Sequence, residues 1–320
     1  MWLAFLCVRI KVSFYAVFYF NNWRGFIMIR NIKKILVMVA MMAWVPFAFA
    51  MSPYIKGNSL AAGDINSVMS QAETKLKAAG FNVIGAYQPK GISDSGVVVV
   101  TDKAILDTIA KIGGDVIVGA GIRVGVKSDG TLSYMNPEYW YRAYFRKNYD
   151  ANQAPVKALQ AHLKEALGAG EQFGGEVDQA SLAKYHYMFG MEYFDDNRDL
   201  VAHESFEKAV ETIRTNLAKG AGNATKVYEV IMPEKKIAVF GVAMNDQKTG
   251  DGVWVNKIEG SDNIAALPYE VFVVGNQTQA LYARYRIALG WSSLKMTSFG
   301  KIMATPGNIK STLKTVAGIE

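Results

Sequence analysis

The chain of 320 residues carries a formal net charge of +7, is 51% hydrophobic and contains one cysteine, Cys7. Six of its 35 basic side chains and none of its 28 acidic ones lie in residues 1–50, so residues 51–320 have a net charge of only +1. Residues 51–320 therefore lack the clustered positive charge that a nucleic-acid or anionic-membrane partner needs, and they have no cysteine for disulfides, thiol catalysis or Cys-ligated metals.

Residues 28–50 have the organisation of an export signal. A basic n-region at residues 30–34 precedes an apolar core of thirteen residues at 35–47, and an A-x-A cleavage site ends at Ala50. Because a bilayer-spanning helix needs roughly 20 apolar residues, we expect cleavage after Ala50, a periplasmic or secreted protein and no stable membrane insertion. Retention as an uncleaved anchor is the alternative.

Residues 1–27 stand in front of this complete signal. They are apolar and aromatic, and we interpret them as upstream read-through, with Met28 as the true start. The alternative is an additional membrane segment at residues 1–20, but Arg9 and Lys11 near its middle would each cost about 2.5–3.5 kcal/mol at a helix centre.

Residues 51–175 predict a first α+β domain. An apolar stripe marks its first helix, which ends at Gly80 after a basic last turn. Asp102 is placed to cap a later helix, and Asn136-Pro137 begins another with Pro at the first position. The expected order is helix 65–79, strand 81–89, strand 97–100, helix 102–112, a hairpin turning at Asp129-Gly130, helices 137–147 and 155–167, and a linker at 168–175.

Residues 176–320 predict a second domain of the same class. Its first helix ends at Gly220, and a strand ending in Pro233 follows. Alternation after Lys236 is typical of a half-buried strand, and Gly275-Asn276 is typical of a hairpin turn. The expected order is an aromatic strand at 184–194, helix 205–219, strand 225–233, a hairpin of 235–244 and 253–258, a hairpin of 269–289, and helix 308–316.

Landmarks recur in the same order in the two halves. The helix-ending Gly80 and Gly220 are 140 residues apart, Pro89 and Pro233 are 144 apart, and the hairpin turns are about 147 apart. Self-similarity at a fixed spacing indicates internal duplication. Helices interleaved with hairpins, rather than strict βαβ units, therefore predict the α+β class: two related α/β sandwich domains with largely antiparallel sheets and helices packed on them.

Short motifs in both halves are similar to those of a bacterial family. In the first half they are Gly80-Phe81-Asn82-Val83 and Tyr134-Met135-Asn136-Pro137-Glu138-Tyr139. In the second half they are Val239-Phe240-Gly241 and Leu267-Pro268-Tyr269-Glu270-Val271. On these residues the chain resembles the bacterial domain of unknown function 302 family, in two diverged tandem copies over about residues 60–150 and 200–290. The first copy lacks the Leu-Pro, and the second lacks the Gly-Phe and the Asn-Pro. The resemblance implies a small α+β domain in each half and supplies no activity or catalytic residue.

The sequence offers little for nucleophilic catalysis. It has no G-x-S-x-G, H-E-x-x-H or Gly-rich phosphate loop, and its histidines are His162, His186 and His203. We expect His162 on a solvated helix face and His203 at a loop end. An enzyme would have to use carboxylates, Tyr or Arg, so we favour a non-catalytic protein and predict no cofactor.

His186 and Met188 carry the metal hypothesis. Imidazole and thioether ligands suit Cu(I), and alternation on a strand puts these two side chains on one face, with Met191 on the other. The alternative is packing, which is the more frequent role of Met among aromatic residues.

An aromatic segment forms the first candidate binding surface. Tyr134 and the helix with Trp140 and Arg142 bring together the residue types that are enriched in binding surfaces. The alternative is a helix packed on its sheet with tyrosine hydroxyls reaching water.

The predicted strand at residues 281–289 forms the second candidate. Tyr282, Arg284 and Arg286 alternate onto one of its faces, where two arginines can clamp a carboxylate or phosphate bidentately. The alternative is that the arginines pair with Glu270 or face solvent.

Together these observations predict an exported, non-catalytic binding or accessory protein. A cysteine-independent periplasmic enzyme and an envelope interaction or structural module are the alternatives. The expected partner is a small anionic or aromatic ligand or an envelope protein. The candidate ligand-binding residues are Arg284, Arg286, Tyr282, Tyr134, Trp140 and Arg142.

Overall fold

The computed structural model describes residues 50–196 and 198–319, which belong to one compact unit. The predictions for residues 1–27 and for the export signal up to residue 49 lie outside this part of the chain. Within the described ranges, no helix combines the length and the apolar character needed to cross a membrane.

The first half of the chain builds a six-stranded antiparallel sheet in the order β3-β4-β5-β6-β2-β7. Its strands are β2 (Tyr54–Lys56), β3 (Asn82–Tyr87), β4 (Ser95–Thr101), β5 (Ile122–Lys127), β6 (Leu132–Met135) and β7 (Gln172–Phe173). Its helices are α2 (Ile65–Ala78), α3 (Lys103–Ile112), the 3-10 helix η1 (Gly114–Gly119), α4 (Pro137–Phe145) and α5 (Gln153–Leu167). As predicted, Asp102 caps α3, where it accepts the Ile105 N–H at 3.0 Å.

The second half builds a five-stranded antiparallel sheet in the order β10-β11-β12-β13-β9. Its strands are β9 (Asp199–Ala202), β10 (Ala224–Met232), β11 (Ile237–Met244), β12 (Tyr269–Val274) and β13 (Gln277–Gln279). Its helices are α6 (Phe206–Ala218), α7 (Asp251–Lys257), the 3-10 helix η7 (Ser261–Ala266), α8 (Ala283–Gly290), α9 (Met296–Phe299) and α10 (Thr305–Val316). A separate short pairing joins β1 (Ala50–Met51) to β8 (Val177–Asp178).

The two halves follow one topology. Apart from single-turn 3-10 segments, each contains the series strand, helix, two strands, helix, 3-10 helix, two strands, helix, and the first strand of the series pairs with its last, β2 with β6 and β9 with β13. After this series the first half adds α5 and β7, and the second half adds α9 and α10. In each sheet the edge strand also pairs with its neighbour through a shift in register. The shift lies between Val83 and Gly85 where β3 pairs with β4, and between Lys226 and Tyr228 where β10 pairs with β11. The prediction of an α+β fold with largely antiparallel sheets and helices packed on them is confirmed.

The halves interlock through their 3-10 helices. η1 packs on β11 and β12 of the second half, while η7 packs on β4, β5 and β6 of the first. Ile264 of η7 lies over Gly125 of β5, where an added Cβ would come within 2.6 Å of the Ile264 side chain. The edge strands β3 and β10 also lie side by side, with Gly85 against the Val227 carbonyl. One hydrophobic core therefore serves both sheets.

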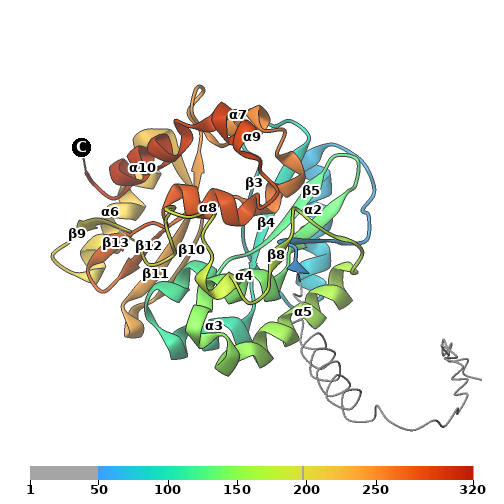
Figure 1. Cartoon of the computed structure of the whole chain (residues 1–320), viewed down its shortest axis with the longest axis horizontal. Helices are drawn as coiled ribbons and strands as arrows, with labels where there is room; N and C mark the ends of the chain where they lie inside the picture. Colours follow the sequence, from blue (N-terminus) through green and yellow to red (C-terminus); the bar gives the residue numbers. More distant parts are fainter. Residues whose placement is uncertain (1–49, 197, 320) are drawn as a thin grey trace, which may run out of the picture. The chain divides into compact units, whose positions relative to one another are not determined.

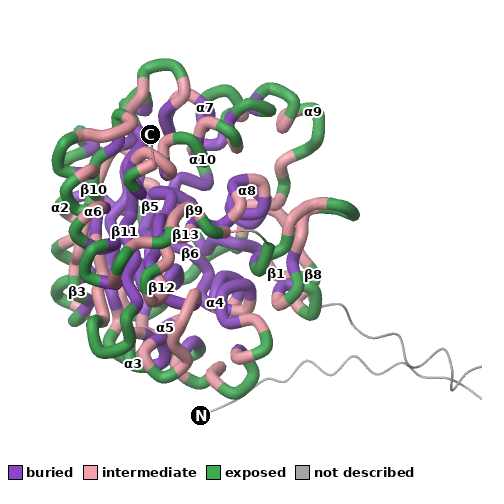
Figure 2. The backbone as a smooth tube through the Cα atoms, turned by 90° about the vertical axis from the view of Figure 1, so that its left-hand side faces the viewer, coloured by how far each residue is buried: buried purple, intermediate pink, exposed green. Residues whose placement is uncertain are grey.

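Helices cover both faces of the two sheets. α2 and α6 lie on one side of the strands, and α4 and α8 lie on the other, where the burial colouring marks them as buried (Figure 2). α8 crosses the centre of the view in front of the strands (Figure 1). The two sheets divide between the halves of the chain, but separate domains at residues 51–175 and 176–320 stay a prediction.

Three predicted elements are wrong. Residues 281–289 are not a strand, because α8 begins at Ala283. Residues 253–258 belong largely to α7 rather than to a hairpin, and residues 184–194 form turns and irregular backbone rather than a strand. In α8, seven of the eight residues are buried, so no polar stripe with a period of 3.6 residues distinguishes it from a strand.

Candidate functional site

Arg286 lies in a buried ion cluster between the two halves. Its Nε donates to Glu270 Oε2 and its Nη2 donates to Glu270 Oε1, both at 2.9 Å. Arg123 Nη1 donates to the same Oε1 at 2.6 Å. The three side chains are at most 2% exposed. Both guanidiniums lie over Trp140, with their Cζ atoms 4.7 Å and 5.0 Å from its ring centroid.

Hydrogen bonds to the Glu270 carboxylate and to backbone carbonyls hold the two guanidiniums of the cluster, which keeps one net positive charge. Further N–H groups of the two arginines donate to backbone carbonyls of η7 at 2.6 and 3.0 Å. Burial lowers the pKa of Arg286, but Glu270 and Tyr144 outweigh this effect and hold the pKa well above its ordinary value. Arg123 and Glu270 are the second residues of the equivalent strands β5 and β12. We therefore interpret the cluster as a structural link between the halves.

The predicted arginine clamp does not form. Residues two apart on a helix point about 200° apart, so Arg284 pairs with Glu192 while Arg286 reaches Glu270. The alternative of a pair with Glu270 is confirmed for Arg286. The Tyr282 ring stays near Arg284, whose Cζ is 5.8 Å from the ring centroid.

Tyr134 and Trp140 are fully buried, so neither presents a surface to a ligand. The Tyr134 hydroxyl and the Trp140 Nε1–H each donate to a backbone carbonyl at 2.8 Å. Arg142 lies 3.5 Å from a Glu138 carboxylate oxygen, and its Cζ is 4.1 Å from the Tyr149 ring centroid. The aromatic segment is thus packed, although the Tyr134 hydroxyl reaches a carbonyl rather than water.

The histidines lie in three separate places. His162 was expected to be solvated, but its ring stacks on Phe81 at 4.1 Å and its Nε2 lies 2.7 Å from the Ala79 carbonyl oxygen. His203 follows β9 at a loop end, as expected, and burial lowers its pKa.

His186 and Met188 lie on irregular backbone, so strand alternation does not bring their side chains together. His186 Nδ1 is 2.8 Å from the Met188 carbonyl oxygen, and its ring packs against Tyr193 with 4.5 Å between centroids. In residues 50–196 and 198–319, no group of three or more His, Cys, Asp or Glu side chains is arranged to hold a metal ion. Copper binding stays a prediction.

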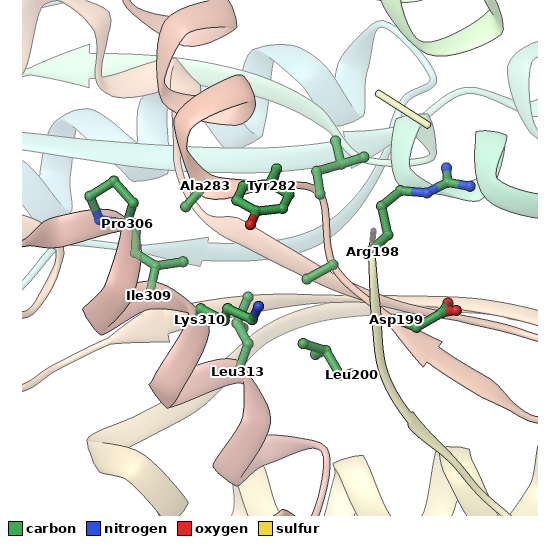
Figure 3. A pocket seen from close by; sticks show the side chains of 11 residues that line it. Arg198, Asp199, Leu200, Tyr282, Ala283, Pro306, Ile309, Lys310 and Leu313 are labelled. Carbon is green, nitrogen blue, oxygen red and sulfur yellow. The ribbon is translucent and has the colours of Figure 1, made fainter. Parts of the chain in front are cut away.

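Tyr282 belongs to a different candidate site, a pocket where β9, the start of α8 and α10 meet (Figure 3). The pocket is shallow, and its volume of about 370 Å³ includes space open to solvent. The apolar residues that line it include Leu200, Leu281, Ala283, Ile309 and Leu313. The polar lining residues are Arg198, Asp199, Tyr282 and Lys310.

Lys310 is the uncommitted cation of this pocket. It is exposed, it has no ion-pair partner among the residues described, and its Nζ lies 5.7 Å from the Tyr282 ring centroid. Arg198 is held in place, because its Nη1 donates to Asp115 Oδ2 at 2.6 Å. Asp199 accepts a hydrogen bond from a neighbouring glutamine side chain at 2.7 Å.

The start of α8 adds positive potential to the pocket wall. The first N–H groups of a helix have no intrahelical acceptor and carry partial positive charge. Tyr282, at the N-cap position, makes no capping hydrogen bond with its side chain. The pocket thus combines three features: the Lys310 ammonium, the N-terminus of α8, and an apolar floor that consists of Leu200, Leu281, Ala283, Ile309 and Leu313. Together these features suit an anion with an apolar body.

The sequence pointed to Tyr282 but not to Lys310, Arg198 or the apolar floor. The signal that could have indicated Lys310 is its position beside the apolar stripe of the predicted helix at residues 308–316. The sequence does not show that this helix lies against β9 and the start of α8, because these three segments are far apart along the chain.

Asp251 is a buried carboxyl group that the sequence did not single out. It is 1% exposed, it accepts the Met244 N–H at 2.9 Å, and it lies 3.5 Å from the Tyr87 hydroxyl. Burial raises its pKa to about 7. No cation pairs with it in the part of the chain that the structure covers, so Asp251 titrates near neutral pH.

Comparisons with protein-family models, with curated proteins and with solved structures found no match to this chain. The resemblance to the domain of unknown function 302 family stays a prediction. A proposal for function therefore rests on the chemistry of the pocket beside α8.

Proposed function

We propose that the protein is exported and binds a small amphipathic anion, without catalysis, in the pocket beside α8. The observation that carries this proposal is the Lys310 ammonium, which has no ion-pair partner within residues 50–196 and 198–319 and lies beside the apolar lining of the pocket. An anion lacking an apolar body would leave the floor in water, and a neutral apolar molecule would leave the ammonium and the helix N-terminus without a partner.

The lining residues define the ligand class. A carboxylate, sulfonate or phosphate would lie between Lys310 and the first N–H groups of α8. Its aliphatic or aromatic body would pack on Ile309, Leu313 and Leu200, with the Tyr282 ring beside it. Because the volume of about 370 Å³ includes space open to solvent, much of the ligand would stay exposed at the mouth of the pocket.

The expected affinity is modest. At about 0.5 kcal/mol per non-hydrogen atom, a ligand such as octanoate would bind with a Kd on the order of 0.1–1 mM. A charge-assisted hydrogen bond contributes about 1.5–3 kcal/mol, so loss of the Lys310 ammonium would weaken binding at least about tenfold.

The binding proposal is tested by displacement of a fluorescent anion, anilinonaphthalene sulfonate, with octanoate. Lys310→Ala should weaken octanoate binding about tenfold, whereas Lys314→Ala, one turn later on α10 and outside the pocket lining, should leave it unchanged. Octanol should displace the probe poorly. Equal octanoate binding by both variants would refute the site.

The same sample separates a binding protein from the enzyme alternative. Incubation with octanoate or benzoate should return the unaltered acid, while conversion to a product would favour an enzyme. Export has its own test, because cleavage after Ala50 predicts that the protein isolated from the periplasm or medium starts at Met51. We further propose that the two halves are diverged copies of one module, which their shared topology supports.

A further inference from the structure

A second hollow lies between the segment that follows α7 and the segment that leads into α9. These two helices are labelled close together in Figure 1. The volume of the hollow, about 780 Å³, includes space open to solvent. We call it the polar hollow, because most of its lining residues are polar: Glu259, Asp262, Asn263, Ser293, Lys295 and Ser298.

The polar hollow presents a carboxylate and an ammonium. Glu259 and Lys295 are both exposed, and neither forms an ion pair, with the other or with any further residue that the structure describes. The third charged residue of the lining, Asp262, is paired with Lys127 of β5. The lining therefore has no excess charge that would favour a simple anion or a simple cation, and a ligand can lie between Glu259 and Lys295.

Asn263 adds a buried hydrogen-bond acceptor to the lining. The residue is 6% exposed, and its Nδ2 donates to the Gly290 carbonyl oxygen at 3.0 Å. Its Oδ1 accepts no hydrogen bond within residues 50–196 and 198–319, whereas buried polar groups are normally paired. A ligand ammonium has three N–H donors, so it can serve Asn263 Oδ1 and the Glu259 carboxylate together.

Glu259 occupies a backbone position that suits glycine. It ends α7 with a φ of 53°, in the left-handed region where glycine is usual after a helix. Its N–H donates to the Asn256 carbonyl oxygen at 3.1 Å, and the Gly260 N–H donates to the Val255 carbonyl oxygen at 2.9 Å. These backbone bonds hold the turn without the glutamate side chain, which agrees with a role for that side chain in the hollow.

We infer that the polar hollow binds a small zwitterion, of the class of α-amino acids with an apolar side chain. The ligand ammonium donates to Glu259 and Asn263, and the ligand carboxylate accepts from Lys295. The apolar side chain of the ligand packs on Ile258 and Leu294, which line the same hollow. This site is separate from the anion pocket beside α8, so either can exist without the other.

The test is an NMR titration of nitrogen-15-labelled protein with leucine. The reporter is the indole N–H of Trp291, which lines the hollow and donates to the Gly260 carbonyl oxygen at 3.0 Å; Trp291→Phe assigns its signal. Leucine is small, so we expect a Kd on the order of 1–10 mM. Leucinamide lacks the carboxylate and isocaproate lacks the ammonium, so each should bind about tenfold more weakly or worse.

Variants of the two charged residues test each end of the ligand. Glu259→Gln and Lys295→Ala should each weaken leucine binding about tenfold. Lys301→Ala removes a nearby cation outside the lining, and Lys310→Ala removes the cation of the pocket beside α8. Both of these controls should bind leucine as wild type does.

A glycine variant separates the role of the Glu259 side chain from folding. Because glycine suits the left-handed position, Glu259→Gly should unfold at the same or a higher urea concentration than wild type, yet bind leucine about tenfold more weakly. Equal leucine binding by wild type and Glu259→Gly would overturn the proposal. So would isocaproate or leucinamide binding as tightly as leucine, or an unchanged Trp291 signal at about 50 mM leucine, well above the expected Kd.

Discussion

Replacement of Glu270 by Gln should destabilise the protein strongly. Glu270 accepts three hydrogen bonds from Arg123 and Arg286, at 2.6 to 2.9 Å, and it is 1% exposed. Glutamine keeps the shape but removes the negative charge, so two buried guanidiniums would lose their counter-ion. Breaking a buried ion pair costs about 3–5 kcal/mol. At roughly 2–4 °C per kcal/mol for a protein of 150–250 residues, the Tm should fall by about 10 °C.

The assay is urea unfolding followed by circular dichroism, with a thermal scan as a second measurement. Asp107→Asn is the control, because the Lys103–Asp107 pair has side chains 87% and 64% exposed and should change the free energy of unfolding by less than about 0.5 kcal/mol. A loss below about 1 kcal/mol for Glu270→Gln would refute the view that this cluster links the two halves.

Three further changes probe other parts of the fold, each by urea unfolding. Gly241→Ala places a Cβ 2.1 Å from the Tyr228 ring and should lower the free energy of unfolding by about 1–3 kcal/mol or more. Gly307→Ala is the control, because no atom lies within 4 Å of its added Cβ, and it should be neutral or slightly stabilising. Equal effects of the two changes would contradict the packing described. Burial raises the folded-state pKa of Asp251 to about 7, above the ordinary value near 3.9. The stability that the protonated carboxyl group contributes is therefore complete below about pH 4 and is lost as the pH rises through 7. Wild type should lose stability relative to Asp251→Asn between pH 4.5 and 8, and a constant difference would disprove the shift. Asp102→Ala removes the N-cap of α3 and should cost about 0.5–2 kcal/mol, while no change would show that the cap is dispensable.

The sequence predicts those elements that are buried on one side. α2 and α6 each show an apolar stripe against a polar face, and Asp102 marks the start of α3, so local pattern and capping chemistry were sufficient. The hairpin turns at Asp129-Gly130 and Gly275-Asn276 were also found, because their dipeptides have a conformational preference of their own.

The sequence fails where tertiary burial removes the pattern. α8 is buried on nearly every side, so Tyr282, Arg284 and Arg286 were placed on one face of a strand. Glu270 was named as an alternative partner for these arginines on an exposed face, and the pair does form for Arg286, but it is buried. The pocket was beyond reach, since Leu200, Tyr282 and Lys310 meet only after the two sheets and α10 have assembled.

The most direct test of the proposed function is a crystal structure of the protein with octanoate. We expect the carboxylate within hydrogen-bonding distance of Lys310 Nζ and facing the start of α8, with the alkyl chain on Ile309 and Leu313. The crystals should be grown at an octanoate concentration that saturates binding in solution. If octanoate then lies elsewhere and this pocket holds none, the proposed site is wrong.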